Sequence, residues 1–184
     1  TRLAIIDIDK GADQPFVTEA GILVFNGEIY NYLELRDELQ SAGAHFKTKS
    51  DTEVLARALE CWGTEAFDKL EGMWAIAWLD KRDNSLLLSR DRFGEKPLFL
   101  HQSATGIYFA STINALKSII PGRLSLNVKK FQENLVFGYR SRHKDSECFI
   151  NEVVNFPSGH FSKITNDLIL EIKPYWDLKV NKKN

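Results

Sequence analysis

The chain has 184 residues, of which 43% are hydrophobic and 27% are charged, a composition typical of a single globular domain with its own core. Its net charge of −1 gives no electrostatic basis for binding nucleic acid or a membrane surface. Cys61 and Cys148 are too few for a disulfide framework or a zinc site, which favours a reducing, cytoplasmic setting. No apolar run is long enough to span a membrane, and no signal peptide is visible.

The first predicted elements are two strands and a helix. Apolar residues at 2–8 and 21–25 indicate strands, and a helix is predicted from about Asn31. Asn31 and Glu34 have the spacing of a capping box, in which the first side chain accepts a backbone N–H and the second returns a bond. Gly43 favours the end of this helix, because glycine readily adopts the backbone conformation that follows a helix.

The next elements are a second helix and a strand. A capping box at Ser50 and Glu53 begins a helix with a continuous apolar stripe, and Gly63 ends it. A short helix is predicted near residues 64–70. Residues 73–79 are apolar at every position, which favours a strand covered on both faces.

The remaining elements alternate between strands and helices. Helices on both sides of a set of apolar strands indicate a layered α+β sandwich. The expected elements are strands at 86–88, 98–100, 107–110, 160–164 and 168–172, and helices at 112–118 and 128–137.

The most informative motif is the run at residues 25–32, which contains Asn26, Gly27 and Glu28 in succession. Asn-Gly is a hairpin signal, so one interpretation is a turn with Glu28 in solvent. The other interpretation is functional, because a side-chain amide beside a glycine N–H offers two donors to a developing oxyanion. The flanking residues are apolar, which favours partial burial, and a buried carboxylate needs a partner.

Three further charged features each have two interpretations. Arg2 is either a surface charge or a fork that binds a ligand carboxylate. Asp51 either complements the helix dipole or accepts a hydrogen bond from a ligand ammonium group. The run at residues 90–97 is interpreted as a turn locked by an Arg–Asp pair, with Gly94 providing backbone freedom.

In this order, the motifs resemble the glutaminase domain of class II glutamine amidotransferases, and most closely that of the glutamine-hydrolysing asparagine synthetases. The resemblance is dense over residues 2–120, which are assigned to the glutaminase domain. Residues 121–184 resemble, more loosely, the segment that joins this domain to a C-terminal ATP-using synthetase domain. The matching stretches are residues 2–7, 14–15, 25–31, 50–54, 70–75, 90–94, 97–98 and 109–111.

The resemblance implies a four-layer α/β/β/α sandwich of the N-terminal-nucleophile hydrolase type. It also implies hydrolysis of glutamine to glutamate and ammonia, with the ammonia used by the synthetase domain to amidate aspartate. ATP and Mg²⁺ are expected for that domain, whereas no cofactor or metal is expected in this chain.

The resemblance also assigns roles to individual residues. By position, the Asn26 side chain and the Gly27 N–H match the oxyanion hole. Arg2 matches the residue that binds the glutamine α-carboxylate, and Glu28 and Asp51 match the acids around its α-ammonium group. A zwitterion needs a cation and one or two anions at fixed spacing, so this set is chemically coherent.

One departure from the family is important. The family's nucleophile is an N-terminal cysteine whose own α-amino group acts as the base, in a segment that is absent before Arg2 in this sequence. Cys61 and Cys148 do not replace it, and Thr1 directly precedes Arg2 and so occupies a later strand. We therefore expect a domain truncated at its N-terminus, with an exposed sheet edge whose consequence is a homodimer, pairing with another chain, or marginal stability. We also expect no ammonia release from glutamine by the chain as given.

Two rival interpretations remain open. The chain could serve a paralogue that modifies sugars or polysaccharides, because the glutaminase half is shared between such enzymes. It could also be a degenerate, non-catalytic binding module, which predicts that the full gene lacks the N-terminal cysteine.

Overall fold

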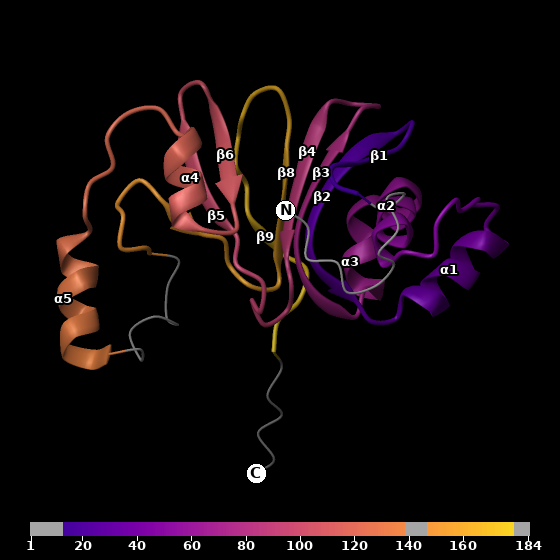
Figure 1. Ribbon diagram of the computed structural model, residues 1–184, viewed down its shortest axis with the longest axis horizontal. Helices are drawn as coiled ribbons and strands as arrows, with labels where there is room; N and C mark the ends of the chain where they lie inside the picture. The colour runs from indigo at the N-terminus through magenta and orange to yellow at the C-terminus, as the bar shows by residue number, and fades with distance from the viewer. Residues whose placement is uncertain (1–12, 139–146, 179–184) are drawn as a thin grey trace, which may run out of the picture. The chain divides into compact units, whose positions relative to one another are not determined.

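The computed structural model describes residues 13–138 and 147–178 (Figure 1). The chain divides into two compact units, one of residues 1–96 and 158–184 and the other of residues 97–157. The strand predicted at residues 2–8 and the candidate ligand-binding Arg2 lie outside the described residues. The functional division between residues 1–120 and 121–184 stays a prediction.

The first unit is an antiparallel sheet with helices packed on one face. Within the described residues the sheet has six strands in the order β1-β2-β3-β4-β8-β9. Figure 1 shows the helices of this unit together on one side of the sheet. The strands are β1 (Phe16–Val17), β2 (Gly21–Ile29), β3 (Gly72–Asp80), β4 (Ser85–Arg90), β8 (His160–Ile164) and β9 (Lys173–Pro174). The helices are α1 (Tyr32–Ser41), α2 (Asp51–Trp62) and α3 (Ala66–Lys69), with a 3₁₀ turn, η2 (Gly63–Glu65), before α3.

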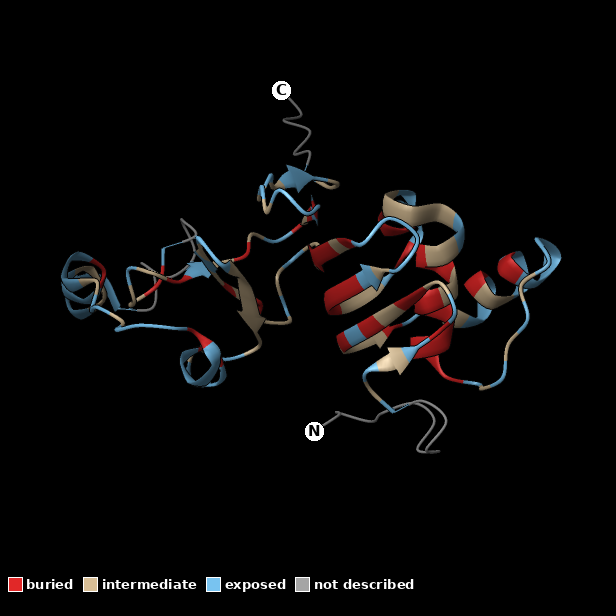
Figure 2. Cartoon of the chain, turned by 90° about the horizontal axis from the view of Figure 1, so that it is seen from above, coloured by how far each residue is buried: buried red, intermediate tan, exposed pale blue. Residues whose placement is uncertain are grey.

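The core of this unit lies between the sheet and α2, where Figure 2 shows the buried residues concentrated. Leu23, Phe25 and Ile29 of β2 are buried in this core. Burying each such side chain contributes about 1.5–3 kcal/mol. Because side chains alternate along a strand, Asn26 and Glu28 lie on the opposite face of β2.

Strand β3 confirms the prediction made from its continuous apolar sequence. Every residue from Trp74 to Trp78 is buried, so both faces of the strand are covered. A strand that exposes one face alternates apolar and polar residues, and this stretch does not. The register of β2 on β3 is unbroken, from Gly21 opposite Asp80 to Ile29 opposite Gly72.

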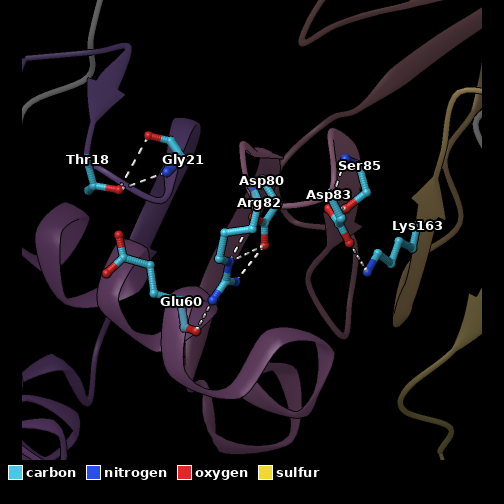
Figure 3. A network of polar contacts seen from close by, with 8 residues as sticks. All are labelled: Thr18, Gly21, Glu60, Asp80, Arg82, Asp83, Ser85 and Lys163. Carbon is cyan, nitrogen blue, oxygen red and sulfur yellow. Dashed lines mark hydrogen bonds and ion pairs between the residues drawn. The ribbon is translucent and has the colours of Figure 1, made fainter.

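A network of charged side chains holds the end of the sheet where β2 begins (Figure 3). The Arg82 guanidinium contacts the Asp80 carboxylate at 2.6 Å and donates to the Glu60 carbonyl at 3.0 Å. Lys163 of β8 pairs with Asp83 at 2.8 Å. Exposed ion pairs are worth only about 0.2–1 kcal/mol each, so their main effect is to fix how β3, β4 and β8 align.

The second unit contains a smaller sheet and two helices. Its strands lie in the order β6-β5-β7, and its core includes Leu116, Ile120, Cys148 and Val153. No helix in the described part of the chain is long and apolar enough to cross a membrane. The elements of this unit are β5 (Phe99–Ser103), β6 (Gly106–Ala110), β7 (Val154–Asn155), α4 (Ile113–Ile119) and α5 (Val128–Phe137).

The two predicted capping boxes have different outcomes. Ser50 accepts a hydrogen bond from the Glu53 N–H at 3.2 Å, which confirms its cap of α2. The prediction at Asn31 is wrong, because its side chain makes no cap bond to α1. The Asn31 amide instead donates to the Lys69 carbonyl at 2.9 Å and accepts from the Glu71 N–H at 3.0 Å. A contact across about forty residues has replaced the local one.

Two predicted strands are also wrong in their extent. The strand predicted at residues 21–25 continues to Ile29, because β3 offers a partner to every residue that follows. Residues 168–172 form no strand, and pairing with β8 begins only at β9. A turn closed by the Leu168 N–H on the Thr165 carbonyl occupies the start of that segment.

The loop after β4 is organised by the carboxylate of Asp91, which is 1% exposed. Its Oδ1 accepts the N–H groups of Phe93 and Glu95 at 3.0 and 2.9 Å. Its Oδ2 accepts those of Lys96 and Trp74 at 3.0 and 3.3 Å. Four backbone donors from the loop and from β3 therefore converge on one side chain.

Arg90 fixes the other side of the same loop. Its guanidinium donates to the Lys96 and Gly94 carbonyls, both at 2.7 Å, and the Tyr175 hydroxyl donates to the Arg90 carbonyl at 2.8 Å. Gly94 has a φ of +69°, in the left-handed region that favours glycine, as the sequence analysis expects. The turn predicted at residues 90–97 is therefore present, with the Arg90 and Asp91 side chains bonded to the loop backbone, whereas the Arg–Asp pair expected to lock it stays a prediction.

We expect Asp91→Asn to lower the free energy of unfolding by about 2 kcal/mol, because the amide NH₂ would face backbone donors that need an acceptor. Urea-induced unfolding of the purified protein measures this change. Asp37→Asn is the matched control: Asp37 is exposed on α1, and the substitution there should change stability by less than about 0.5 kcal/mol. Equal stability losses in the two variants would contradict the role given to Asp91.

Candidate functional site

Asn26, Gly27 and Glu28 lie within β2, five to seven residues after Gly21, where the strand begins beside the network of Figure 3. They stand opposite Ala75, Trp74 and Met73 of β3. The strand therefore supports this run along its whole length, and the turn interpretation of Asn-Gly is wrong. A polar group held by a sheet can be kept in a fixed position for chemistry.

The backbone N–H groups along the outer edge of β2 form a row. Strand bonds alternate in direction, so every second residue of β2 points its N–H away from β3. Gly21 donates to Thr18 Oγ1 at 3.0 Å, Phe25 to Gln14 Oε1 at 2.7 Å and Ile29 to Asp51 Oδ2 at 3.2 Å. Gly27 belongs to the same row, and its N–H has no hydrogen-bond partner among the residues that the structure describes.

Close approach of β2 and β3 requires glycine at this point. A Cβ on Gly27 would overlap the Met73 carbonyl oxygen, and one on Gly72 would overlap the Glu28 carbonyl oxygen. Each glycine thus leaves room for a backbone carbonyl of the opposite strand, that of Met73 beside Gly27 and that of Glu28 beside Gly72. Any larger residue at Gly27 would push β2 off β3 and move the open N–H.

Asp51 and Glu28 bring negative charge to the same end of β2. Asp51 is 5% exposed at the start of α2, where Ser50 supplies the cap, so its carboxylate is available for another role. Burial raises the pKa of the Asp51 carboxyl, and the charge of Glu28 also raises it, whereas hydrogen bonds from the Ile29 and Thr52 N–H groups lower it. Two acids close enough to repel each other would be relieved by a cation between them.

The loop after β4 borders this region. Burial raises the pKa of Tyr30, and the charges of Glu95, Glu28 and Asp91 raise it further, in that order. Glu95 of the loop and Glu28 of β2 are therefore each within electrostatic reach of Tyr30. The start of α2 contacts the end of β2 through Asp51, and the loop contacts β3 through Asp91 at Trp74, the residue opposite Gly27.

The structure brings together four of the five residues assigned to the site from the sequence. Asn26, Gly27 and Glu28 share one strand, and Asp51 contacts that strand through Ile29. Arg2, the fifth, lies outside the described residues, so its convergence with the others stays a prediction. Cys148 is buried in the second unit and Cys61 is exposed near the end of α2.

One residue that bears on the site was not given a role from the sequence. The Gln14 side chain donates to the Phe25 carbonyl and accepts from the Phe25 N–H, both at 2.7 Å. In the sequence, Gln14 stands out only as part of a stretch that matches the family. No local pattern predicts a partner 11 residues away, because the contact depends on how β1 and β2 meet.

Comparisons with known proteins agree on one family. The glutamine amidotransferase domain family matches residues 1–176. Glutamine-hydrolyzing asparagine synthetase 2 of Bacillus subtilis is 37% identical over 185 residues, which is 97% of this chain and 24% of that protein. Asparagine synthetase 1 of the same organism is 39% identical over 177 residues, which is 95% of this chain and 27% of that protein. The chain thus spans about a quarter of the length of these relatives.

A solved structure shows the same fold. Glutamine phosphoribosylpyrophosphate amidotransferase from Bacillus subtilis, complexed with ADP and GMP, matches with a TM-score of 0.61 and 17% identity. The match covers 94% of this chain and 34% of that one. This likeness confirms the predicted fold class, an α+β fold of the N-terminal-nucleophile hydrolase type.

The raised pKa of Asp51 gives a pH-dependent test. The ionised carboxylate is less favourable in the folded state than in the unfolded state, so the stability that Asp51 contributes is full below about pH 4 and is lost as pH rises through its folded-state pKa. We therefore expect Asp51→Asn to become more stable relative to the unsubstituted protein as pH rises. Urea unfolding at a series of pH values measures the difference.

Asp83→Asn is a control with the opposite sign. The hydrogen bond from Lys163, and then that from Ser85, hold the pKa of Asp83 well below its usual range. Its contribution is present above about pH 4 and is lost as pH falls, so Asp83→Asn should lose relative stability as pH rises. If both variants shifted in the same direction with pH, the electrostatic account of Asp51 would be wrong.

Proposed function

The chain belongs to the glutamine amidotransferase domain family, and from this membership we propose that it forms the glutamine-hydrolysing part of an asparagine-synthetase-type protein. The reaction takes glutamine and water to glutamate and ammonia. In the full-length protein the ammonia amidates aspartate in an ATP- and Mg²⁺-dependent domain. A cytoplasmic location is part of the same proposal.

The open N–H of Gly27 is the observation that carries this proposal. Attack on the side-chain amide of glutamine gives a tetrahedral intermediate whose oxygen is negatively charged. Two fixed donors stabilise such an oxyanion better than water does, because they need no reorganisation as charge develops. The Gly27 N–H supplies one donor, and the amide of the adjoining Asn26 supplies the other.

The acids at the end of β2 support recognition of an amino acid. Asp51 is buried and Glu28 is half-buried, so a ligand ammonium group between them would gain two charge-assisted hydrogen bonds and relieve their repulsion. Arg2 would bind the α-carboxylate at the other end of the ligand. These contacts select a zwitterion with a free backbone and leave the side-chain amide for the oxyanion hole.

The nucleophile in this family is an N-terminal cysteine, by the resemblance given above. Cys61 is exposed near the end of α2, and Cys148 is buried in the second unit. We expect the full-length protein to carry the N-terminal cysteine, with its α-amino group as the base. The sequence of the gene upstream of Thr1 tests this expectation directly.

We expect Asn26→Ala in the full-length protein to lower kcat for glutamine hydrolysis about 100- to 1,000-fold, the usual effect of removing one oxyanion donor. KM for glutamine should change little, because the donor acts mainly on the transition state. Ammonia released from glutamine in steady-state assays measures both constants.

Asn166→Ala is the matched control, because Asn166 is exposed in a turn remote from β2 in sequence. It should leave both constants unchanged. A full-length protein that releases no ammonia from glutamine would exclude the glutaminase and favour the non-catalytic binding module. An active protein whose Asn26→Ala variant keeps its kcat would exclude only the oxyanion role of Asn26.

A further inference from the structure

The side chain of Gln14 acts as a substitute for a strand residue beside β2. β1 pairs with β2 at two positions only, Val17 opposite Ile22 and Phe16 opposite Leu23. The strand pairs end there, and Gln14, the next residue in register with this edge, bonds to β2 through its side chain. The next residue of β2 with its backbone groups on this edge is Phe25, and the Gln14 amide satisfies both of them at 2.7 Å.

This contact fixes the peptide planes that lead to the open N–H. The Phe25 carbonyl and the Asn26 N–H share one planar peptide unit, and the next unit carries the Gly27 N–H. Gln14 holds the first of these units, and Asp51 holds the unit that ends at the Ile29 N–H. The Gly27 N–H therefore lies between two anchored points on the same edge.

The position of an oxyanion donor matters more than its presence. An N–H stabilises an oxyanion only when it lies about 2.7–3.1 Å from the position that the oxygen reaches in the intermediate. The Gly27 N–H shares a planar peptide unit with the Asn26 carbonyl, which faces β3, so the direction of this N–H depends on the pairing with β3 and on the peptide units on either side. Gln14 is the nearest side chain bonded to this edge on the N-terminal side.

We propose that Gln14 is a positioning residue of the oxyanion hole, which aims the Gly27 N–H by clamping both backbone groups of Phe25. The proposal rests on the glutaminase function proposed above. Gln14 does not touch the substrate, and its effect passes through the backbone of β2. Loss of the clamp lets the Gly27 N–H rotate away from the developing oxyanion while the acids that bind the ligand stay in place.

The test compares Gln14→Met with the unsubstituted full-length protein. Methionine keeps the length of the side chain and loses both hydrogen bonds. We expect kcat for glutamine to fall about 10- to 100-fold, the scale of a small misplacement of a catalytic group, with KM changed less than about twofold. Gln40→Met makes the same substitution at an exposed position of α1 and should leave both constants unchanged.

The Gln14→Glu variant distinguishes an effect on the position of the Gly27 N–H from an effect on the stability of the fold. The new carboxylate can still accept the Phe25 N–H, but it repels the Phe25 carbonyl, and protonation restores a donor toward that carbonyl. The ratio of the kcat of this variant to that of the unsubstituted protein should therefore rise as pH falls. Thermal unfolding of each variant shows that the assays are made on folded protein, and this variant carries the test alone if Gln14→Met does not fold.

The outcomes distinguish this proposal from the proposed function. A folded Gln14→Met variant with normal kcat, or a Gln14→Glu variant whose relative kcat is independent of pH, would overturn the positioning role while glutaminase activity stands. A rise in KM with kcat unchanged would overturn it as well, because it would place Gln14 in ligand binding. An unsubstituted full-length protein without glutaminase activity would overturn both proposals.

Discussion

Beyond the two residues that β1 pairs with β2, the backbone groups on the outer edge of β2 have no adjacent strand among the described residues. Each such group left without a partner in a buried setting costs about 1–3 kcal/mol. Side chains from three separate segments, Thr18, Gln14 and Asp51, satisfy this edge one residue at a time. Among the described residues, none of these side chains bonds to the N–H of Gly27, so the hydrogen bonds along this edge mark the position of the candidate site.

The two ends of the first unit have opposite electrostatic character. At the end where β2 begins, Asp83 forms a favourable ion pair with Lys163, and Asp80 forms one with Arg82. At the other end, burial and Glu28 make the charge on Asp51 costly. Proteins commonly hold unfavourable charges where a ligand will neutralise them, and rely on other regions for stability. The favourable ion pairs of Asp83 and Asp80 and the unfavourable charge of Asp51 therefore lie at opposite ends of β2.

Local signals in the sequence predicted most of the elements. The unbroken apolar run of β3 predicted its burial on both faces, and the Ser50 cap predicted the start of α2. The local pattern at Asn26 and Gly27 left two interpretations open, a turn or a pair of donors, and the resemblance to a family favoured the donors. Where the local signal failed, at Asn31, a partner distant in sequence took the side chain away from the helix. The contact of Gln14 with Phe25 was not predicted for the same reason, because a contact between strands produces no periodic pattern in the sequence.

The loop after β4 shows a different way of specifying shape. Asp91 binds the backbone N–H groups of Phe93, Glu95 and Lys96, and Arg90 binds backbone carbonyls, so the contacts that fold the loop use almost none of its own side chains. The side chains of Phe93 and Glu95 are exposed. Substitution of Glu95 should therefore leave the fold of the loop unchanged, whereas Phe93 also packs edge-on against Trp176, with ring centroids 5.2 Å apart. Because the backbone of this loop is held by Asp91 and Arg90, substitutions of its exposed side chains can change what the loop binds without changing its backbone conformation.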